Sequence, residues 1–258
     1  TKFSFEAKQV TRGVFQGVGS NSTFQADIVS GEGTLLENPG VKPVLDLSSM
    51  EASGGVNLNY TGKGGVFTGK GSRISWTKDG RSRLEANAGS RVEARGRFEE
   101  DGLPYILTAT WIEFDETELQ ALFPEFALDR PAALPQILGG RTKTELHSGS
   151  AEWMTADEAG LLLAGKAHFS GKTDKGQPID LDAGSMHVLR LPEGTSRTQG
   201  IDELVAWDGF RLRVGKELVG TGEILEAGYR VMRMEGRPAT LGVQGFIWES
   251  NNIEYDVQ

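Results

Sequence analysis

Apolar and polar residues alternate along most of this chain. In residues 84–94, for example, Leu84 and Val92 fall on one face, while Arg83 and Glu93 fall on the other. An alternation with a period of two is typical of a β-strand that buries one face. The same period recurs in residues 161–169, 179–191, 210–214 and 232–235. The pattern therefore predicts a protein built mainly of one-sided strands.

Turn sequences separate these stretches at regular intervals. Glycine accounts for 35 of the 258 residues and is spread along the whole chain. Residues that tolerate a positive φ occur in segments 78–81, 99–102, 173–176 and 227–228. A strand and turn every 8–12 residues or so suits an all-β sandwich, jelly roll or solenoid, and disfavours parallel α/β units. We therefore expect an all-β fold.

One segment departs from the alternation. Residues 117–123 have a short helical pattern, with Asp115 as its cap and Glu118 completing a capping box. Across residues 116–140 the period of two lapses, and the segment contains three prolines and a Gly-Gly pair. We predict a first β unit over residues 1–115, a linker with a helical turn over 116–140, and a second β unit over 141–258.

Short blocks of the first unit recur in the second. Residues 71–76, 84–86 and 112–115 have counterparts at residues 222–226, 234–236 and 253–256. The first two pairs are offset by 150 residues and the third by 141. The later copy is therefore shorter within one interval. A repeat with a single localised gap indicates two related β units.

Composition excludes several classes of function. The chain has no cysteine, which removes disulfide scaffolds, cysteine-ligated zinc and thiol nucleophiles. Its formal charge of −9 argues against duplex nucleic acid as the main partner. No run of residues approaches the roughly 18 apolar positions of a membrane-spanning helix. The chain starts at Thr1 without a leader, so we expect a mature or trimmed chain from which a signal or anchor has been removed.

Motifs for catalysis or metal binding are weak. Residues 64–70 nearly match a phosphate-binding loop, but Gly71 stands where a Ser or Thr would contact magnesium. His147, His168 and His187 are too far apart in sequence to form a local metal-binding motif. We therefore predict no catalytic residue, no metal and no cofactor.

A recurring motif carries a resemblance to a known family. It comprises a glycine-led strand, a turn, the triplet "Leu or Met, Glu, small residue" and a closing "Ile, Glu, aromatic, Asp" strand. It is clearest in residues 231–241 and 245–256, and weaker in 65–93 and 107–115. From about residue 65 to the end, the pattern resembles the OstA-like repeat of the periplasmic lipopolysaccharide-transport proteins. The resemblance implies an open β-jellyroll, in which two facing sheets leave an apolar groove for the acyl chains of lipopolysaccharide.

The resemblance also implies a function and partners. Members of this family are non-enzymatic modules that convey lipopolysaccharide or a related glycolipid across the periplasm. The resemblance leaves three alternatives open: a free periplasmic bridge, a member anchored to the inner membrane by a segment absent from this sequence, or the periplasmic part of a larger outer-membrane protein. Such modules join other OstA-like β-jellyroll proteins end to end by strand addition. The expected partners are thus the glycolipid and neighbouring modules, without nucleic acid.

Two sets of residues are predicted to form the lipid site. Apolar residues on the alternating faces line the groove: Ile74, Trp76, Leu84, Val92, Leu161, Leu163, Phe169, Leu181, Phe210, Leu212, Met232, Met234 and Tyr255. Basic residues at the groove mouth bind phosphates or acidic sugars: Arg73, Arg83, Arg91, Arg211 and Arg213. For the aromatic and methionine residues of this set, packing in a closed β core is an equal alternative: Trp76, Phe169, Phe210, Met232, Met234 and Tyr255.

Two other functions fit the same pattern. One is a carbohydrate-binding or adhesive protein, built as a β-sandwich or β-helix, whose exposed aromatic side chains stack on sugars. The other is a hydrolase on a β scaffold. A hydrolase needs a convergent pair of carboxylates, and the sequence singles out no such pair.

Overall fold

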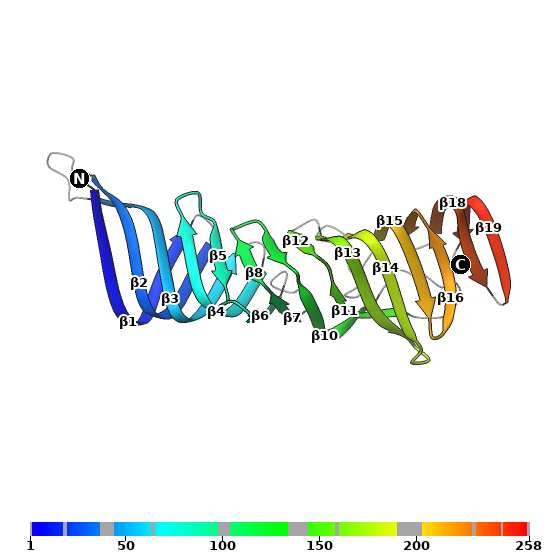
Figure 1. Ribbon diagram of the computed structural model, residues 1–258, viewed down its shortest axis with the longest axis horizontal. Helices are drawn as coiled ribbons and strands as arrows, with labels where there is room; N and C mark the ends of the chain where they lie inside the picture. Colours follow the sequence, from blue (N-terminus) through cyan, green and yellow to red (C-terminus); the bar gives the residue numbers. More distant parts are fainter. Residues whose placement is uncertain are drawn as a thin grey trace, which may run out of the picture.

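The computed structural model of the chain is all-β and elongated (Figure 1). It describes residues 2–17, 20–36, 44–62, 65–97, 104–133, 144–157, 160–189, 203–228, 231–243 and 245–256. Within these ranges every regular element is a strand, which confirms the all-β prediction. The strands cross the long axis of the molecule, with β1 (Lys2–Gly17) at one end and β19 (Phe246–Asp256) at the other.

The remaining strands follow one another along the chain. The first half contributes β2 (Ser20–Leu36), β3 (Val44–Gly62), β4 (Gly65–Thr77), β5 (Ser82–Glu85), β6 (Val92–Arg97), β7 (Pro104–Ala109), β8 (Trp111–Phe114), β9 (Leu119–Leu122) and β10 (Glu125–Ala133). The second half contributes β11 (Thr144–Ser150), β12 (Trp153–Asp157), β13 (Gly160–Thr173), β14 (Pro178–Leu189), β15 (Glu203–Val214), β16 (Glu217–Gly222), β17 (Ile224–Ala227) and β18 (Val231–Val243).

The strands pair antiparallel in one connected sheet that divides and rejoins. Strands β1 to β4 pair in sequence. From β4 one branch runs through β5, β8, β9 and β12, and the other through β6, β7, β10 and β11. Both branches meet again at β13. The sheet continues through β14 and β15, divides into β16 and β17, and closes with β18 and β19.

This pattern arises because each long strand bends once, at a shift in its pairing register. In β3 the shift falls between Ser53 and Val56, and in β13 it falls between Ala164 and Ala167. Where the sheet is divided, a turn takes the place of the bend. Register shifts of this kind mark bulges, which bend a strand and increase its twist. The line of bends along the molecule, which we call the fold line, separates the sheet into two arms.

Each arm contains one half of every bent strand. Arm A contains residues 2–10, 28–36, 44–53, 73–77, 160–164, 185–189, 203–207, 231–235 and 252–256, with strands β5, β8, β9, β12 and β17. Arm B contains residues 13–17, 20–25, 56–62, 65–71, 167–173, 178–183, 210–214, 239–243 and 246–250, with strands β6, β7, β10, β11 and β16.

Glycines supply backbone conformations that the fold line requires. Gly54, Gly55 and Gly165 have φ values of 83°, 75° and 75°, a region that costs other L-residues about 1–2 kcal/mol. Backbone hydrogen bonds continue across the line, as where the Glu152 amide donates to the Gly165 carbonyl at 2.8 Å. The arms are therefore joined on this side by the chain itself and by backbone hydrogen bonds.

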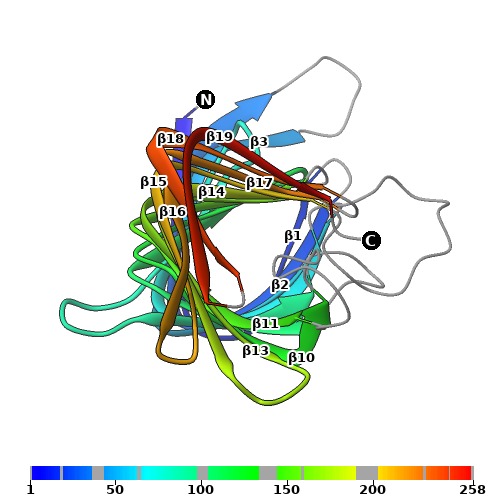
Figure 2. The ribbon, with the colours of Figure 1, turned by 90° about the vertical axis from the view of Figure 1, so that its right-hand side faces the viewer.

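The two arms face each other when the molecule is viewed along its long axis (Figure 2). The side chains between them form one shared apolar interior. Alternate residues of each strand point into it: Leu84, Val92 and Ala94 are fully buried, whereas Arg83 and Glu93 on the same strands are partly exposed. This confirms the one-sided strands that the alternation predicts. The predicted continuity of residues 84–94 is wrong, because residues 86–91 cross the fold line and carry the chain from arm A to arm B.

The helical turn predicted over residues 117–123 is also wrong. Asp115 does accept hydrogen bonds from the backbone amides of Thr117 and Glu118, at 2.8 and 3.0 Å. The turn that it caps leads into strand β9 instead of a helix. Strands β9 and β10 both lie in the predicted linker and pair on both sides, so residues 119–133 belong to the sheet. Residues 134–140 of that linker lie outside the described residues.

Candidate functional site

Most of the predicted groove residues lie in the shared interior. Those that are no more than 4% exposed are Ile74, Trp76, Leu84, Val92, Leu163, Phe169, Leu181, Phe210, Leu212, Met232 and Met234. Leu161 is partly buried and packs against the same cluster, and the side chain of Tyr255 lies outside the described residues. The structure thus brings this set together between the arms. Its role in binding a lipid stays a prediction.

The interior changes in character along the molecule. Toward β1 it is aromatic, with Phe15, Phe24, Tyr60, Phe67, Trp76 and Phe114. Toward β19 the buried side chains include Met154, Met186, Met232, Met234, Ala206 and Ala227. Methionine side chains are flexible and adapt to irregular partners. The half near β19 is therefore the part of the interior best suited to repacking.

Aromatic side chains join the two arms away from the fold line. Phe114 of arm A packs edge-on against Tyr60 and Phe67 of arm B, with ring centroids 4.7 and 5.0 Å apart. The hydroxyl of Tyr60 also donates a hydrogen bond to the backbone carbonyl of Asp115, in the turn between β8 and β9. We call Tyr60, Phe67, Phe114 and Asp115 the aromatic clasp. It links the free sides of the arms through side-chain contacts.

The clasp makes alkaline stability depend on Tyr60. Burial, followed by the negative charges of Asp115 and Glu116, raises the pKa of Tyr60 from 10.0 to about 12. Its stabilising effect is therefore complete below pH 10 and is lost as the pH rises through 12. We predict that the free energy of unfolding falls over this window, and that Tyr60→Phe makes the fall shallower. Burial also raises the pKa of Tyr105, so part of the fall should persist. The free energy of unfolding is measured by urea unfolding at each pH. An equal fall with pH in the native protein and in Tyr60→Phe would contradict the prediction.

A second aromatic group joins the arms near β1. Trp76 on arm A packs against Phe24 and Phe15 on arm B, with ring centroids 4.7 and 5.9 Å apart. Trp76 is 2% exposed, and its indole nitrogen Nε1 has no hydrogen-bond partner. This group therefore combines apolar packing with a buried donor.

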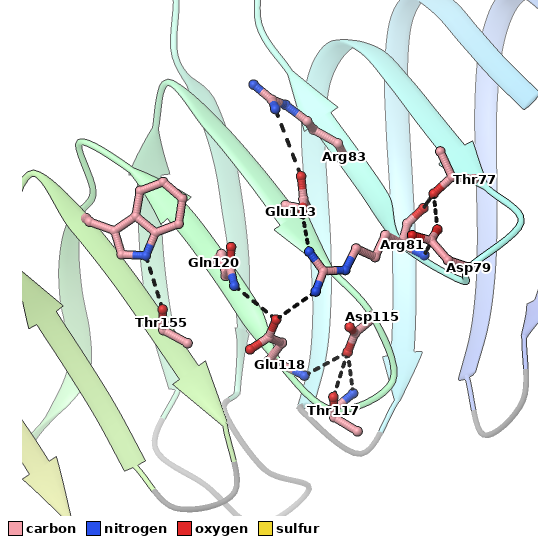
Figure 3. Close-up of polar contacts among 11 residues, drawn as sticks. Thr77, Asp79, Arg81, Arg83, Glu113, Asp115, Thr117, Glu118, Gln120 and Thr155 are labelled. Atoms are coloured by element: carbon pink, nitrogen blue, oxygen red, sulfur yellow. Dashed lines mark hydrogen bonds and ion pairs between the residues drawn. The ribbon is translucent and has the colours of Figure 1, made fainter. Parts of the chain in front are cut away.

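The outer face of arm A carries a connected row of charged side chains (Figure 3). Arg81 lies 3.2 Å from Glu113 and 3.7 Å from Glu118, and Glu118 accepts a hydrogen bond from the Gln120 side chain at 2.9 Å. Arg83 approaches Glu113 from the other side, at 3.9 Å. Exposed ion pairs of this kind contribute about 0–1 kcal/mol each. The row lies on the outer face of arm A and is separate from the apolar interior.

Two tryptophans lie beside this row. Trp111 and Trp153 pack edge to face with centroids 5.2 Å apart, and the guanidinium of Arg83 lies 4.3 Å from the centroid of Trp111. The Trp153 indole donates to Thr155 at 3.2 Å. A sugar ring stacks on a free aromatic face, whereas one face of Trp111 is already occupied by Arg83. That face of Trp111 is therefore not free to stack on a sugar ring.

The five predicted groove-mouth arginines lie elsewhere. Arg73 and Arg83 are on the outer face of arm A, where they pair with Glu51 at 2.5 Å and with Glu85 at 2.8 Å. Arg91 comes directly after the crossing of the fold line, just before β6, and its guanidinium lies 2.5 Å from the Glu125 carboxylate. Arg211 and Arg213 are exposed on the outer face of arm B, directly cross-strand from Asp182 and Asp180. The alternation that puts apolar residues inside puts these arginines on the outside of the sheet. Their role at a groove mouth stays a prediction.

The remaining titratable clusters are small. His168 on the outer face of arm B lies 2.7 Å from Asp182 and 3.9 Å from Asp180. Among the described residues no three His, Asp or Glu side chains are grouped in a way that fits a metal ion. Over the same residues, no helix has the length and apolar character that crossing a membrane requires.

The two ends of the molecule differ. Within the described ranges, β1 pairs only with β2, and β19 pairs only with β18, so each presents an unpaired edge. At the β19 end Phe246 and Trp248 stack on each other and are 68% and 49% exposed. Trp248 is cross-strand from the buried Leu241, so both rings continue the inner face of the sheet. At the β1 end Phe5 lies over Gly31 and is less exposed, at 38%.

The aromatic residues of the clasp were not singled out by the sequence analysis. Val56, Leu58 and Tyr60 alternate with asparagines, and Ile112 and Phe114 alternate with Trp111 and Glu113. This period of two was available as a signal for inward-facing side chains. Nothing local to these segments indicates that Tyr60 and Phe114, on different arms, meet.

No protein-family model matches this chain, and no curated protein or solved structure matches it either. Its function has to be inferred from the residues and the geometry described above.

Proposed function

We propose that this chain is a non-enzymatic lipid-binding module of the open β-jellyroll kind, which holds the acyl chains of lipopolysaccharide or a related glycolipid between its arms. The observation that carries the proposal is how the arms are joined. Backbone hydrogen bonds connect them along the fold line. In the aromatic clasp on the opposite side, the described contacts are instead made by side chains, with each other or with a backbone carbonyl. Such a sheet can part on one side without losing its backbone pairing.

The chemistry of the interior supports a lipid as the guest. Arm A and arm B contribute apolar side chains along the whole length of the molecule. Burying acyl chains there is worth about 25 cal/mol per Å² of apolar surface removed from water. The methionines near β19 add side chains that can adjust to the guest. A hydrolase is less well supported, because the charged side chains described here gather on the outer faces.

The two ends support assembly with similar modules. Unpaired edges at β1 and β19 offer backbone donors and acceptors for strand addition. The exposed rings of Phe246 and Trp248 continue the apolar inner face to the edge at β19. We propose that another OstA-like module adds its own edge strand there, which would extend the apolar interior from one protein to the next in the periplasm.

Photo-crosslinking from adjacent residues of β14 tests the proposal. Met186 is fully buried between the arms, while the neighbouring His187 points outward. We expect a benzophenone amino acid at position 186, but not at 187, to form adducts with lipopolysaccharide. Circular dichroism of both variants confirms that they are folded.

A deacylated polysaccharide serves as the control ligand. The proposal predicts that it does not compete with lipopolysaccharide, because the acyl chains carry the binding. Competition by the polysaccharide, together with adducts at position 187 alone, would contradict the lipid proposal and favour carbohydrate binding at the outer face.

A further inference from the structure

The buried indole nitrogen of Trp76 is the most unusual polar group of the interior. Tryptophan N–H groups usually have a hydrogen-bond partner when buried. Trp76 is 2% exposed, and its Nε1 atom has none. Leaving a buried donor unsatisfied is energetically costly. A guest that supplies an acceptor to Nε1 would recover part of that cost.

Other polar side chains gather around the same point. Ser82 is directly cross-strand from Trp76 on arm A, and Ser22 is directly cross-strand from Phe15 on arm B. Both serines are buried, at 4% and 3% exposure. Buried polar side chains are few among the described residues, and these two lie in the strands next to the Trp76 group. The apolar interior therefore contains a local polar spot near β1.

One of the two rings that pack against Trp76 lies on an edge strand. Phe15 is partly buried, and its strand β1 pairs with β2 alone within the described residues. A side chain on an edge strand can change its packing with less disturbance than one in the middle of a sheet. Displacing Phe15 would remove one of the two rings that pack against Trp76.

We propose that Trp76 Nε1 donates a hydrogen bond to the carbonyl oxygen of an ester- or amide-linked acyl chain. This inference rests on the proposed function and adds a chemical requirement to it. The guest must carry a carbonyl at the head of its acyl chain, which sits near Ser22 and Ser82 while the chain runs along the apolar interior. A purely hydrocarbon or ether-linked chain lacks the acceptor.

Matched lipids test this requirement. Dimyristoyl phosphatidylglycerol has two ester carbonyls, and its di-O-tetradecyl ether analogue has the same headgroup and no carbonyl. We expect the native protein to bind the ester lipid about tenfold more tightly than the ether lipid, a ratio equivalent to 1.4 kcal/mol. Trp76→Phe, which keeps a ring but removes the N–H, should bind both lipids equally. Trp111→Phe, on the outer face, should keep the native preference.

Nuclear magnetic resonance provides a readout that does not depend on the variants. The Trp76 indole ¹⁵N–¹H resonance should shift downfield with the ester lipid and much less with the ether lipid. Equal binding of the two lipids by the native protein, or an ester preference that survives Trp76→Phe, would overturn the inference and leave the lipid proposal standing. Failure to bind either lipid or lipopolysaccharide would overturn both.

Discussion

Phe114→Ala is expected to lower the free energy of unfolding by about 3–5 kcal/mol. Phe114 is 2% exposed, and its ring packs edge-on against Tyr60 and Phe67 of the other arm. Removing it deletes a large buried side chain and leaves a cavity between the arms. It also removes the centre of the aromatic clasp, one of the contacts that hold the free sides of the arms together. Urea unfolding followed by circular dichroism measures the loss.

Phe123→Ala is the matched control. Phe123 is 53% exposed at the fold line, so the same chemical change there should cost less than about 1 kcal/mol. Similar losses in the two variants would show that Phe114 does not hold the arms together as described.

Gly171→Ala should be nearly as damaging, by about 3 kcal/mol. Gly171 is buried in β13, and a methyl group there would lie 2.0 Å from the backbone carbonyl oxygen of Glu145 on β11. The obstacle is backbone, so relief requires β11 to move away from its partner. The neighbouring strand pairing in arm B would then weaken. The loss is again measured by urea unfolding.

Gly228→Ala provides the comparison for this substitution. At Gly228 the nearest atom to an added methyl group is the Val231 carbonyl oxygen at 3.7 Å, an ordinary contact. The change should therefore shift stability by no more than about 0.5 kcal/mol. A small effect at both positions would mean that the close approach of β11 and β13 is wrong.

The residues of the repeated sequence blocks lie opposite one another on paired strands of arm A. Ile74, Leu84 and Ile112 form one cross-strand row in arm A. In the later copy the corresponding row pairs Met234 with Ile253 on one side and with Leu225 on the other. The sequence match aligned Ile224 with Ile74 and was wrong by one residue. A one-residue slip moves a side chain to the other face of a strand, and Leu225 is the fully buried residue of the two.

Alternation predicts which side of a strand is buried because only the local period is needed. The outward position of Arg73 and the inward position of Leu84 both follow from that period. The bend of each strand across the fold line is different, since it depends on register shifts between partners such as β3 and β4. The period therefore indicates that the arginines face outward, and their position at a groove mouth stays a prediction. Alternation predicts which face of a strand a side chain is on. It does not predict where along the arm, between the fold line and the free side, that residue lies.

The clasp and the Trp76 group illustrate the same limit. Tyr60 and Asp115 are 55 residues apart, and they meet only because arm A and arm B are folded toward each other. No spacing rule relates such positions. In contrast, the hydrogen bonds of Asp115 to Thr117 and Glu118 are local. The sequence identified Asp115 as a cap for that reason, although it assigned the cap to a helix.

The central claim is that lipid binds between arms that part on one side. Because the chain lacks cysteine, cysteines introduced in place of Thr61 of arm B and Thr117 of arm A can be spin-labelled selectively. Both positions are exposed near the aromatic clasp. A control pair, Thr61 and Lys172, lies within arm B. Pulsed electron paramagnetic resonance should show the Thr61–Thr117 distances lengthening when lipopolysaccharide is added, with the control pair unchanged. Lipopolysaccharide that binds at saturation while leaving the Thr61–Thr117 distances unaltered would contradict the claim.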